Sequence, residues 1–209
     1  MERGLVAALL CVSACAAQSY EVGGNIGYGL YRSVRVNAPG AQAEAGIRNR
    51  FAAGALIAED MYDYISGEIR YLYQDGDPFL SAGSLEANIQ GQSHTLNYDV
   101  LFHFKDVDQK LRPFVAVGAG VKYYRASGPE PRPQPLASVA SLVHTDEWCF
   151  TADVGFGLKY RIRRRVVVRA EFRDYITRFP KKLFSPAPGG TDRGLFQMFT
   201  PMVGVGYLF

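Results

Sequence analysis

Histidine, serine and acidic side chains that could form a catalytic set occur together in one stretch of the chain. The sequence has three histidines, and His94 directly follows Ser93, with Glu86 a short distance upstream. These residue types could supply a nucleophile, a base and an acid for attack on a lipid ester. We favour the simpler interpretation, in which the stretch is a polar loop at the start of a strand. We expect no enzyme, and a lipid-modifying barrel stays a minor alternative.

Candidate metal ligands and thiols are few. Asp75, Asp77 and Glu86 could gather around calcium, but Gly76 and Pro78 between them are typical of a plain turn. We therefore predict no metal site and no cofactor. The net charge of +3 gives no electrostatic case for nucleic acid as a partner.

The first residues have the pattern of an export signal. A short basic start precedes an apolar run from Leu5 to Ala14, and Ala17 offers a small residue before a cut at Gln18. We predict a signal peptide at 1–17 and one barrel domain at 18–209. An uncleaved anchor is one alternative. Lipidation of Cys15 within Val12-Ser13-Ala14-Cys15 is another. Cleavage before Gln18 would leave Cys149 as the one cysteine, which excludes an internal disulfide.

The elements that position these side chains are eight segments in which apolar and polar residues alternate with a period of two. This period predicts strands, and about ten residues suffice for a tilted strand to cross a hydrocarbon core. Eight is the even number expected of a closed single-chain barrel. We predict an all-β fold, an eight-stranded antiparallel up-and-down transmembrane β-barrel. The segments are 20–30, 45–57, 65–73, 95–104, 115–123, 150–161, 166–173 and 199–209.

The polar phase of these segments decides which face points outward. It mixes glycine with charges of both signs, which suits the narrow inside of an eight-stranded barrel better than a solvent-facing surface. A soluble lipocalin-like binder, with the phases reversed, is the alternative. The predicted barrel-interior charges are Arg48, Arg50, Glu68, Arg70, Asp99, His103, Lys122, Asp153, Lys159, Arg169, Glu171 and Arg173.

The links between segments alternate between long and short, in the order long, short, long, short, long, short, long. Outer-membrane barrels have short periplasmic turns and long external loops, so we expect both termini to be periplasmic. Aromatic side chains near the segment ends predict a girdle at the two membrane interfaces. The girdle residues are Tyr20, Tyr73, Phe104, Tyr123, Trp148 and Tyr160.

The last segment ends in an alternating row that closes on the C-terminal phenylalanine: Val203, Val205, Tyr207 and Phe209. This row resembles the C-terminal signature that the barrel assembly machinery recognises. The stretches Phe114–Gly120 and Val168–Tyr175 are also similar to the small OmpA-like and OmpX-like barrel families, without a peptidoglycan-binding domain. The resemblance covers 19–209. It implies the barrel fold and a bacterial outer-membrane location, whereas the functions of these families are mixed.

Two functions fit a barrel with inward charges. If the charges pair, they form a packed plug, and the protein is a non-catalytic monomer that serves envelope structure or surface interaction. If the cations line a path, the barrel is a narrow pore for small solutes. Membrane lipid and lipopolysaccharide are the expected partners, and Arg178, Lys181, Lys182 and Arg193 in the last long link could meet lipopolysaccharide.

Overall fold

The computed structural model describes residues 19–189, 191–192 and 194–209, and all of its regular elements are strands. The predicted signal peptide and Arg193 lie outside these residues. Within the described part of the chain, no helix is long and apolar enough to cross a membrane.

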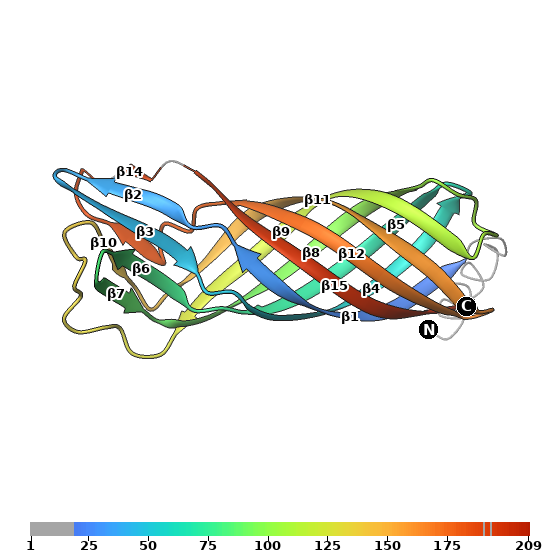
Figure 1. Cartoon of the computed structure of the whole chain (residues 1–209), viewed down its shortest axis with the longest axis horizontal. Helices are drawn as coiled ribbons and strands as arrows, with labels where there is room; N and C mark the ends of the chain where they lie inside the picture. Colours follow the sequence, from blue (N-terminus) through green and yellow to red (C-terminus); the bar gives the residue numbers. More distant parts are fainter. Residues whose placement is uncertain (1–18, 190, 193) are drawn as a thin grey trace, which may run out of the picture.

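Eight long antiparallel strands close into one barrel (Figure 1). Neighbours in the ring are neighbours in the chain, and β1 closes against β15 with Ile26 opposite Val203. The predicted eight-stranded up-and-down barrel is therefore confirmed. In ring order the strands are β1 (Tyr20–Tyr31), β15 (Leu195–Leu208), β12 (Val166–Arg178), β11 (Asp146–Arg163), β9 (Leu111–Ser127), β8 (Gln90–His103), β5 (Ile65–Asp75) and β4 (Arg50–Tyr62).

Both ends of the described chain lie at the same end of the barrel. The Tyr20 amide donates to the Phe209 carbonyl at 3.2 Å, and the Phe209 amide donates back at 3.0 Å. The links at this end, which we call the terminal end, are the short ones: 63–64, 104–110 and 164–165. The strands are longer than predicted, reaching 17 residues in β9 and 18 in β11. They therefore extend beyond the length that a bilayer requires.

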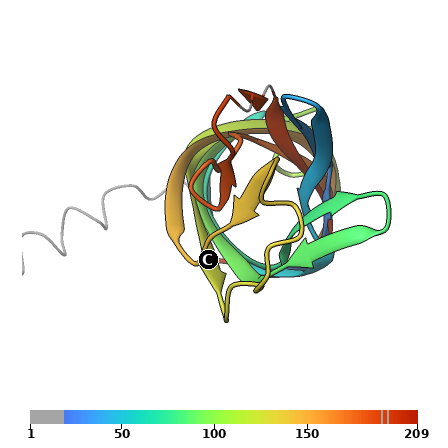
Figure 2. The same cartoon turned by 90° about the vertical axis from the view of Figure 1, so that its left-hand side faces the viewer.

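The long links at the opposite end are not loops but a folded cap. Its larger part is a five-stranded sheet, and its smaller part is the strand pair β10 (Ala140–Leu142) and β13 (Phe184–Pro186). Seen from that end, β10 crosses the middle of the ring (Figure 2). In order, the sheet contains β14 (Thr191–Asp192), β2 (Val34–Ala38), β3 (Ala41–Ile47), β6 (Pro78–Ala82) and β7 (Leu85–Asn88).

The cap encloses the largest hydrophobic core of the described chain. Val36, Leu80, Leu142 and Phe184 are fully buried in it, and Phe196 of β15 joins it to the barrel. The short strands of the cap show why this core forms. Val34 and Val36 of β2 alternate with polar residues. The buried side of the five-stranded sheet packs over the mouth of the barrel.

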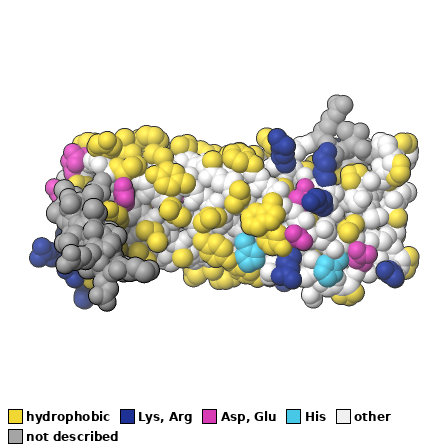
Figure 3. Space-filling model, turned by 180° about the vertical axis from the view of Figure 1, so that it is seen from behind, with side chains coloured by type: hydrophobic (Ala, Val, Ile, Leu, Met, Phe, Trp, Pro, Cys, Tyr) yellow, Lys and Arg dark blue, Asp and Glu magenta, His cyan; other side chains and the backbone are white. Residues whose placement is uncertain are grey.

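The apolar residues of the barrel strands face outward and the polar residues face inward, as the sequence predicts. Outward side chains are apolar and exposed, among them Ile26 at 55%, Phe156 at 60% and Val203 at 56% of their surface. They cover the middle of the length, whereas charged side chains in view gather toward the two ends (Figure 3). We call this apolar band the belt. A belt outside and charges inside exclude the lipocalin-like arrangement and match a membrane-spanning barrel.

Inward glycines make room for the charged interior. A Cβ atom placed on Gly118 would collide with the carboxylates of Asp99 and Asp153, which face each other across it. One on Gly206 would collide in the same way with Glu21. Small residues beside long ones thus allow a narrow barrel to hold many ionised groups.

Candidate functional site

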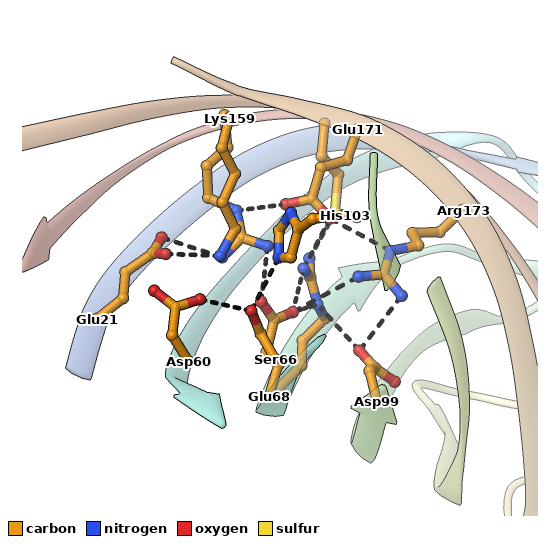
Figure 4. A network of polar contacts seen from close by, with 12 residues as sticks. Glu21, Asp60, Ser66, Glu68, Asp99, His103, Lys159, Glu171 and Arg173 are labelled. Atoms are coloured by element: carbon orange, nitrogen blue, oxygen red, sulfur yellow. Dashed lines mark hydrogen bonds and ion pairs between the residues drawn. The ribbon is translucent and has the colours of Figure 1, made fainter. Parts of the chain in front are cut away.

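The barrel interior holds a continuous network of ion pairs, drawn in Figure 4. Two strands supply most of it, because alternation on β5 and β12 places every second residue inward. Arg70 Nη2 lies 2.7 Å from Glu171 Oε2 and also pairs with Glu68. Arg169 Nη2 lies 2.6 Å from Glu68 Oε2, so these groups bridge opposite walls of the barrel.

The network continues on the cap side through Arg173. Its Nη1 lies 2.9 Å from Asp153 Oδ2 and 3.3 Å from Asp99 Oδ2. Its Nε lies 3.2 Å from Glu171 Oε2. A guanidinium group has five donors in a fixed fork, so one arginine can hold several carboxylates together.

Ten of the predicted interior residues are buried inside the barrel. They are Glu68, Arg70, Asp99, His103, Lys122, Asp153, Lys159, Arg169, Glu171 and Arg173. The placement of the remaining two, Arg48 and Arg50, was predicted wrongly. Both are about half exposed and lie at the cap end, where Arg48 pairs with Glu86 and Arg50 pairs with Asp77. Strand β3 ends at Ile47 and strand β4 begins at Arg50, so the two strands do not share one alternation of inward and outward residues.

Three charged residues of the interior, Glu21, Asp60 and Arg112, were not predicted from the sequence. Glu21 Oε2 accepts from Lys159 Nζ at 2.8 Å, and Asp60 Oδ1 accepts from Arg112 Nη1 at 3.0 Å. Glu21 stands in the polar phase of the first segment, which is the signal that could have found it. Asp60 and Arg112 lie near the turns of the terminal end, where the pattern is short.

The interior charges balance among the described residues. The described interior holds six carboxylates and six cations, and every cation except Lys122 is in an ion pair with one of these carboxylates. The carboxylates are Glu21, Asp60, Glu68, Asp99, Asp153 and Glu171, and the cations are Arg70, Arg112, Lys122, Lys159, Arg169 and Arg173. Burying an ionised group without a partner costs several kcal/mol. Pairing across the walls removes most of that cost and fills the cross-section with side chains.

Lys122 differs from the other interior cations. It is fully buried, and it makes no ion pair with a carboxylate in the described part of the chain. Its Nζ donates to Tyr31 Oη at 3.2 Å and contacts Met198 Sδ at 3.1 Å. The rings of Tyr31 and Tyr124 lie 5.0 and 5.1 Å from the ammonium, a cation–π contact on each side. This layer lies between the ion-pair network and the cap core.

The candidate catalytic set does not assemble. Ser93 points into the barrel, where its Oγ lies 3.3 Å from Tyr31 Oη. His94, the next residue, points outward, and its Nδ1 lies 2.7 Å from Tyr71 Oη. Glu86 lies in the cap, paired with Arg48. Adjacent residues of a strand face opposite sides, so Ser93 and His94 cannot act on one substrate.

A serine and a histidine do meet inside the terminal end of the barrel. Ser66 Oγ donates to Asp60 Oδ1 at 2.6 Å and lies 2.8 Å from His103 Nε2 (Figure 4). Here the carboxylate accepts a hydrogen bond from the serine hydroxyl, whereas in a triad the carboxylate orients the histidine through Nδ1. All three side chains are largely buried. This contact completes the polar interior and lacks the order of groups that activates a nucleophile.

The candidate metal ligands are engaged in ion pairs. Arg50 lies between Asp75 and Asp77, and Glu86 pairs with Arg48. No group of three or more histidine, cysteine or acidic side chains suited to a metal ion occurs in the described ranges. Cys149 is a buried free thiol opposite Lys122.

The predicted girdle residues lie on the outer wall at two levels. Tyr20, Phe104 and Tyr160 are at the terminal end. Tyr73, Tyr123 and Trp148 are at the cap end, in one row across four adjacent strands. His94 completes this row, and the rings of Tyr123 and Trp148 are 4.7 Å apart. The residues of the C-terminal signature, Val203, Val205, Tyr207 and Phe209, also point outward and are exposed.

Comparison with known proteins finds likeness in structure alone. No protein-family model matches the sequence, and no curated protein sequence matches it. The barrel is similar to the outer membrane protein OprG from Pseudomonas aeruginosa, with a TM-score of 0.56 at 16% identity over 92% of this chain and 96% of that one. It is also similar to Neisserial surface protein A (NspA), with a TM-score of 0.54 at 11% identity over 91% and 97%.

At these identities the likeness shows the fold. It confirms the predicted architecture of the small outer-membrane barrels. Together with the apolar belt, the fold identifies an outer-membrane protein.

Proposed function

We propose that this chain is a non-catalytic outer-membrane β-barrel with a closed interior, which serves envelope structure or contact at the cell surface. The observation that carries the proposal is the interior itself, in which six carboxylates pair with five cations among the described residues. The Lys122 layer and the apolar core of the cap lie above this network. Three successive packed layers support a plug in preference to a conducting path.

The proposed orientation places the cap outside the cell and both termini in the periplasm. Short turns at the terminal end and long links at the cap end support it, because outer-membrane barrels share this asymmetry. The closed ring of eight strands leaves no barrel edge for pairing with a second copy, which supports a monomer. Lipid, lipopolysaccharide and, during biogenesis, the barrel assembly machinery are the proposed partners.

Planar bilayer recording tests the closed interior. The purified protein, inserted as single molecules, is expected to give no steady conductance, while a general porin in the same bilayer gives the positive control. Folding of the barrel is verified separately by heat-modifiability on a gel, in which an unboiled closed barrel runs at a shifted apparent mass. Steady, ion-selective conductance would replace the plug with the narrow pore.

The absence of catalysis is tested through the lipids of the host. Cells that produce the protein and cells that produce a His94→Ala variant are expected to give the same lipid A mass profile. A modification that depends on His94 would make the protein a lipid-modifying enzyme.

A further inference from the structure

A polar groove lies on the outer wall where β1 passes into the cap. Its volume is about 720 Å³, within the range of small-molecule sites. The end of β1, strands β2 and β3, and the start of β15 form its walls. It is lined by Arg32, Ser33, Val34, Arg35, Glu44, Gly194, Leu195 and Gln197.

The groove begins where the belt ends. Tyr28 and Leu30 are outward, apolar residues of β1. Arg32, two positions after Leu30, is also exposed, and it is the first cation in this outward row. The Arg32 amide donates to the Gln197 carbonyl at 3.0 Å, which fixes Arg32 beside the start of β15. Leu195, 63% exposed, lies on the groove wall itself. A molecule in the groove would therefore touch apolar surface on one side and guanidinium groups on the other.

The two arginines of the groove differ from those of the barrel interior in their partners, and Arg35 of β2 lies opposite Glu44 of β3. Both arginines are exposed, and neither makes an ion pair with a carboxylate of the described residues. Arg32 Nη1 donates to Gln197 Oε1 at 3.1 Å, and Gln197 Nε2 donates to Asp174 Oδ2 at 3.1 Å. The side-chain amide of Gln197 thus holds one edge of the Arg32 guanidinium, and the other N–H donors of Arg32 remain open. Glu44 is the one described acidic residue in the lining.

A neighbouring hollow provides an internal comparison. It shares Ser33 with the groove, has a volume of about 370 Å³ and contains Arg48 and Arg50. Their guanidinium groups are already paired with carboxylates of the cap and of β5. Of the arginines that line the two hollows, Arg32 and Arg35 are the two without an ion pair to a described carboxylate, so they are the ones available to an external anion.

We propose that this groove binds the phosphorylated sugar headgroup of an outer-leaflet glycolipid. Arg32 and Arg35 contact the phosphate, and Leu30 and Leu195 contact the adjoining acyl chain. Guanidinium groups bind phosphate through paired, charge-assisted hydrogen bonds. A soluble anion would use the cations alone, whereas this groove joins cations to the apolar belt. The inference rests on the proposed orientation, which places the cap end in the outer leaflet.

Native mass spectrometry of the full protein released from mixed micelles tests the site. The micelles contain diphosphoryl lipid A, dephosphorylated lipid A or phosphatidylglycerol at equal mole fraction. We expect retention of diphosphoryl lipid A, and a loss of about tenfold or more in the Arg32→Gln/Arg35→Gln variant, as for removal of charge-assisted hydrogen bonds. The matched control is Arg48→Gln/Arg50→Gln, in which retention is expected to change by less than about twofold.

Two results would overturn the inference. Equal retention by the native protein and the Arg32→Gln/Arg35→Gln variant would show that the groove is not the site. Retention of phosphatidylglycerol equal to that of diphosphoryl lipid A would make it a general phosphate site.

The orientation is tested separately. A Ser84→Cys variant, at the exposed turn between β6 and β7, is expected to react with a membrane-impermeant maleimide on intact cells. Failure of this labelling in a correctly folded barrel would overturn the orientation without altering the binding result.

Discussion

Arg169 of β12 joins three interior carboxylates from three different strands, and its removal gives a sharp test of the plug. Its guanidinium lies 3.1 Å from Glu21 Oε1, 2.6 Å from Glu68 Oε2 and 2.9 Å from Glu171 Oε1. Arg169→Met retains an unbranched apolar chain and removes the charge. Breaking a buried ion pair by deleting one partner costs about 3–5 kcal/mol.

The other cations of the network reduce the expected cost. Lys159 remains on Glu21, while Arg70 and Arg173 remain on Glu68 and Glu171, so each carboxylate keeps at least one partner. We therefore expect the lower part of the range, a loss of about 3 kcal/mol in the free energy of unfolding. With a urea dependence of about 2 kcal/mol per molar, the unfolding midpoint falls by about 1.5 M.

Urea unfolding of the protein reconstituted in vesicles measures this shift. Arg178→Met is the matched control, because Arg178 is an exposed arginine on the same strand and its loss should change stability by less than about 0.5 kcal/mol. Adding Glu68→Gln to Arg169→Met restores the charge balance and should recover part of the loss. Equal midpoints for the Arg169 and Arg178 variants would refute the argument that the interior is held by paired charges.

Three further measurements address other parts of the molecule. Gly118→Ala places a methyl group against two buried carboxylates and should cost about 1–3 kcal/mol, whereas Gly24→Ala, with ordinary space around its Cβ, should be nearly neutral; equal urea midpoints would contradict the packed interior. Leu142→Ala should destabilise the cap by about 2–5 kcal/mol and speed proteolysis of 128–145, while the gel shift of the barrel persists; a lost shift would mean that cap and barrel unfold together. Fluorescence of Trp148, the one tryptophan, should be quenched more strongly by lipids brominated near the headgroup than near the chain end; the reverse order would contradict its place at the interface.

The barrel could be predicted from the sequence because its main signal is local. Period-two alternation repeats in every spanning strand, and a lipid-facing belt requires each outward residue to be apolar. The prediction of Arg48 and Arg50 failed at the one place where alternation runs through a break between two strands. Three consecutive polar residues, Arg48, Asn49 and Arg50, mark that break.

The cap and the pairing inside the barrel could not be predicted in the same way. Val34 and Val36 alternate with polar residues, but five residues are too few to distinguish a strand from a loop. The interior pairs join residues that are far apart in the chain, as with Arg169 and Glu21, separated by 148 positions. A single sequence gives the sign of each inward charge but not its partner across the barrel.

The buried charges also constrain how the barrel enters the membrane. A separate β12 would carry Arg169, Glu171 and Arg173 into hydrocarbon without their partners on other strands. Each arginine at the bilayer midplane costs about 2–4 kcal/mol, so this strand alone would be strongly disfavoured. Strands that neutralise one another must therefore meet before or during crossing. Insertion and ring closure become a single concerted event, and half-inserted intermediates with an open seam should be short-lived.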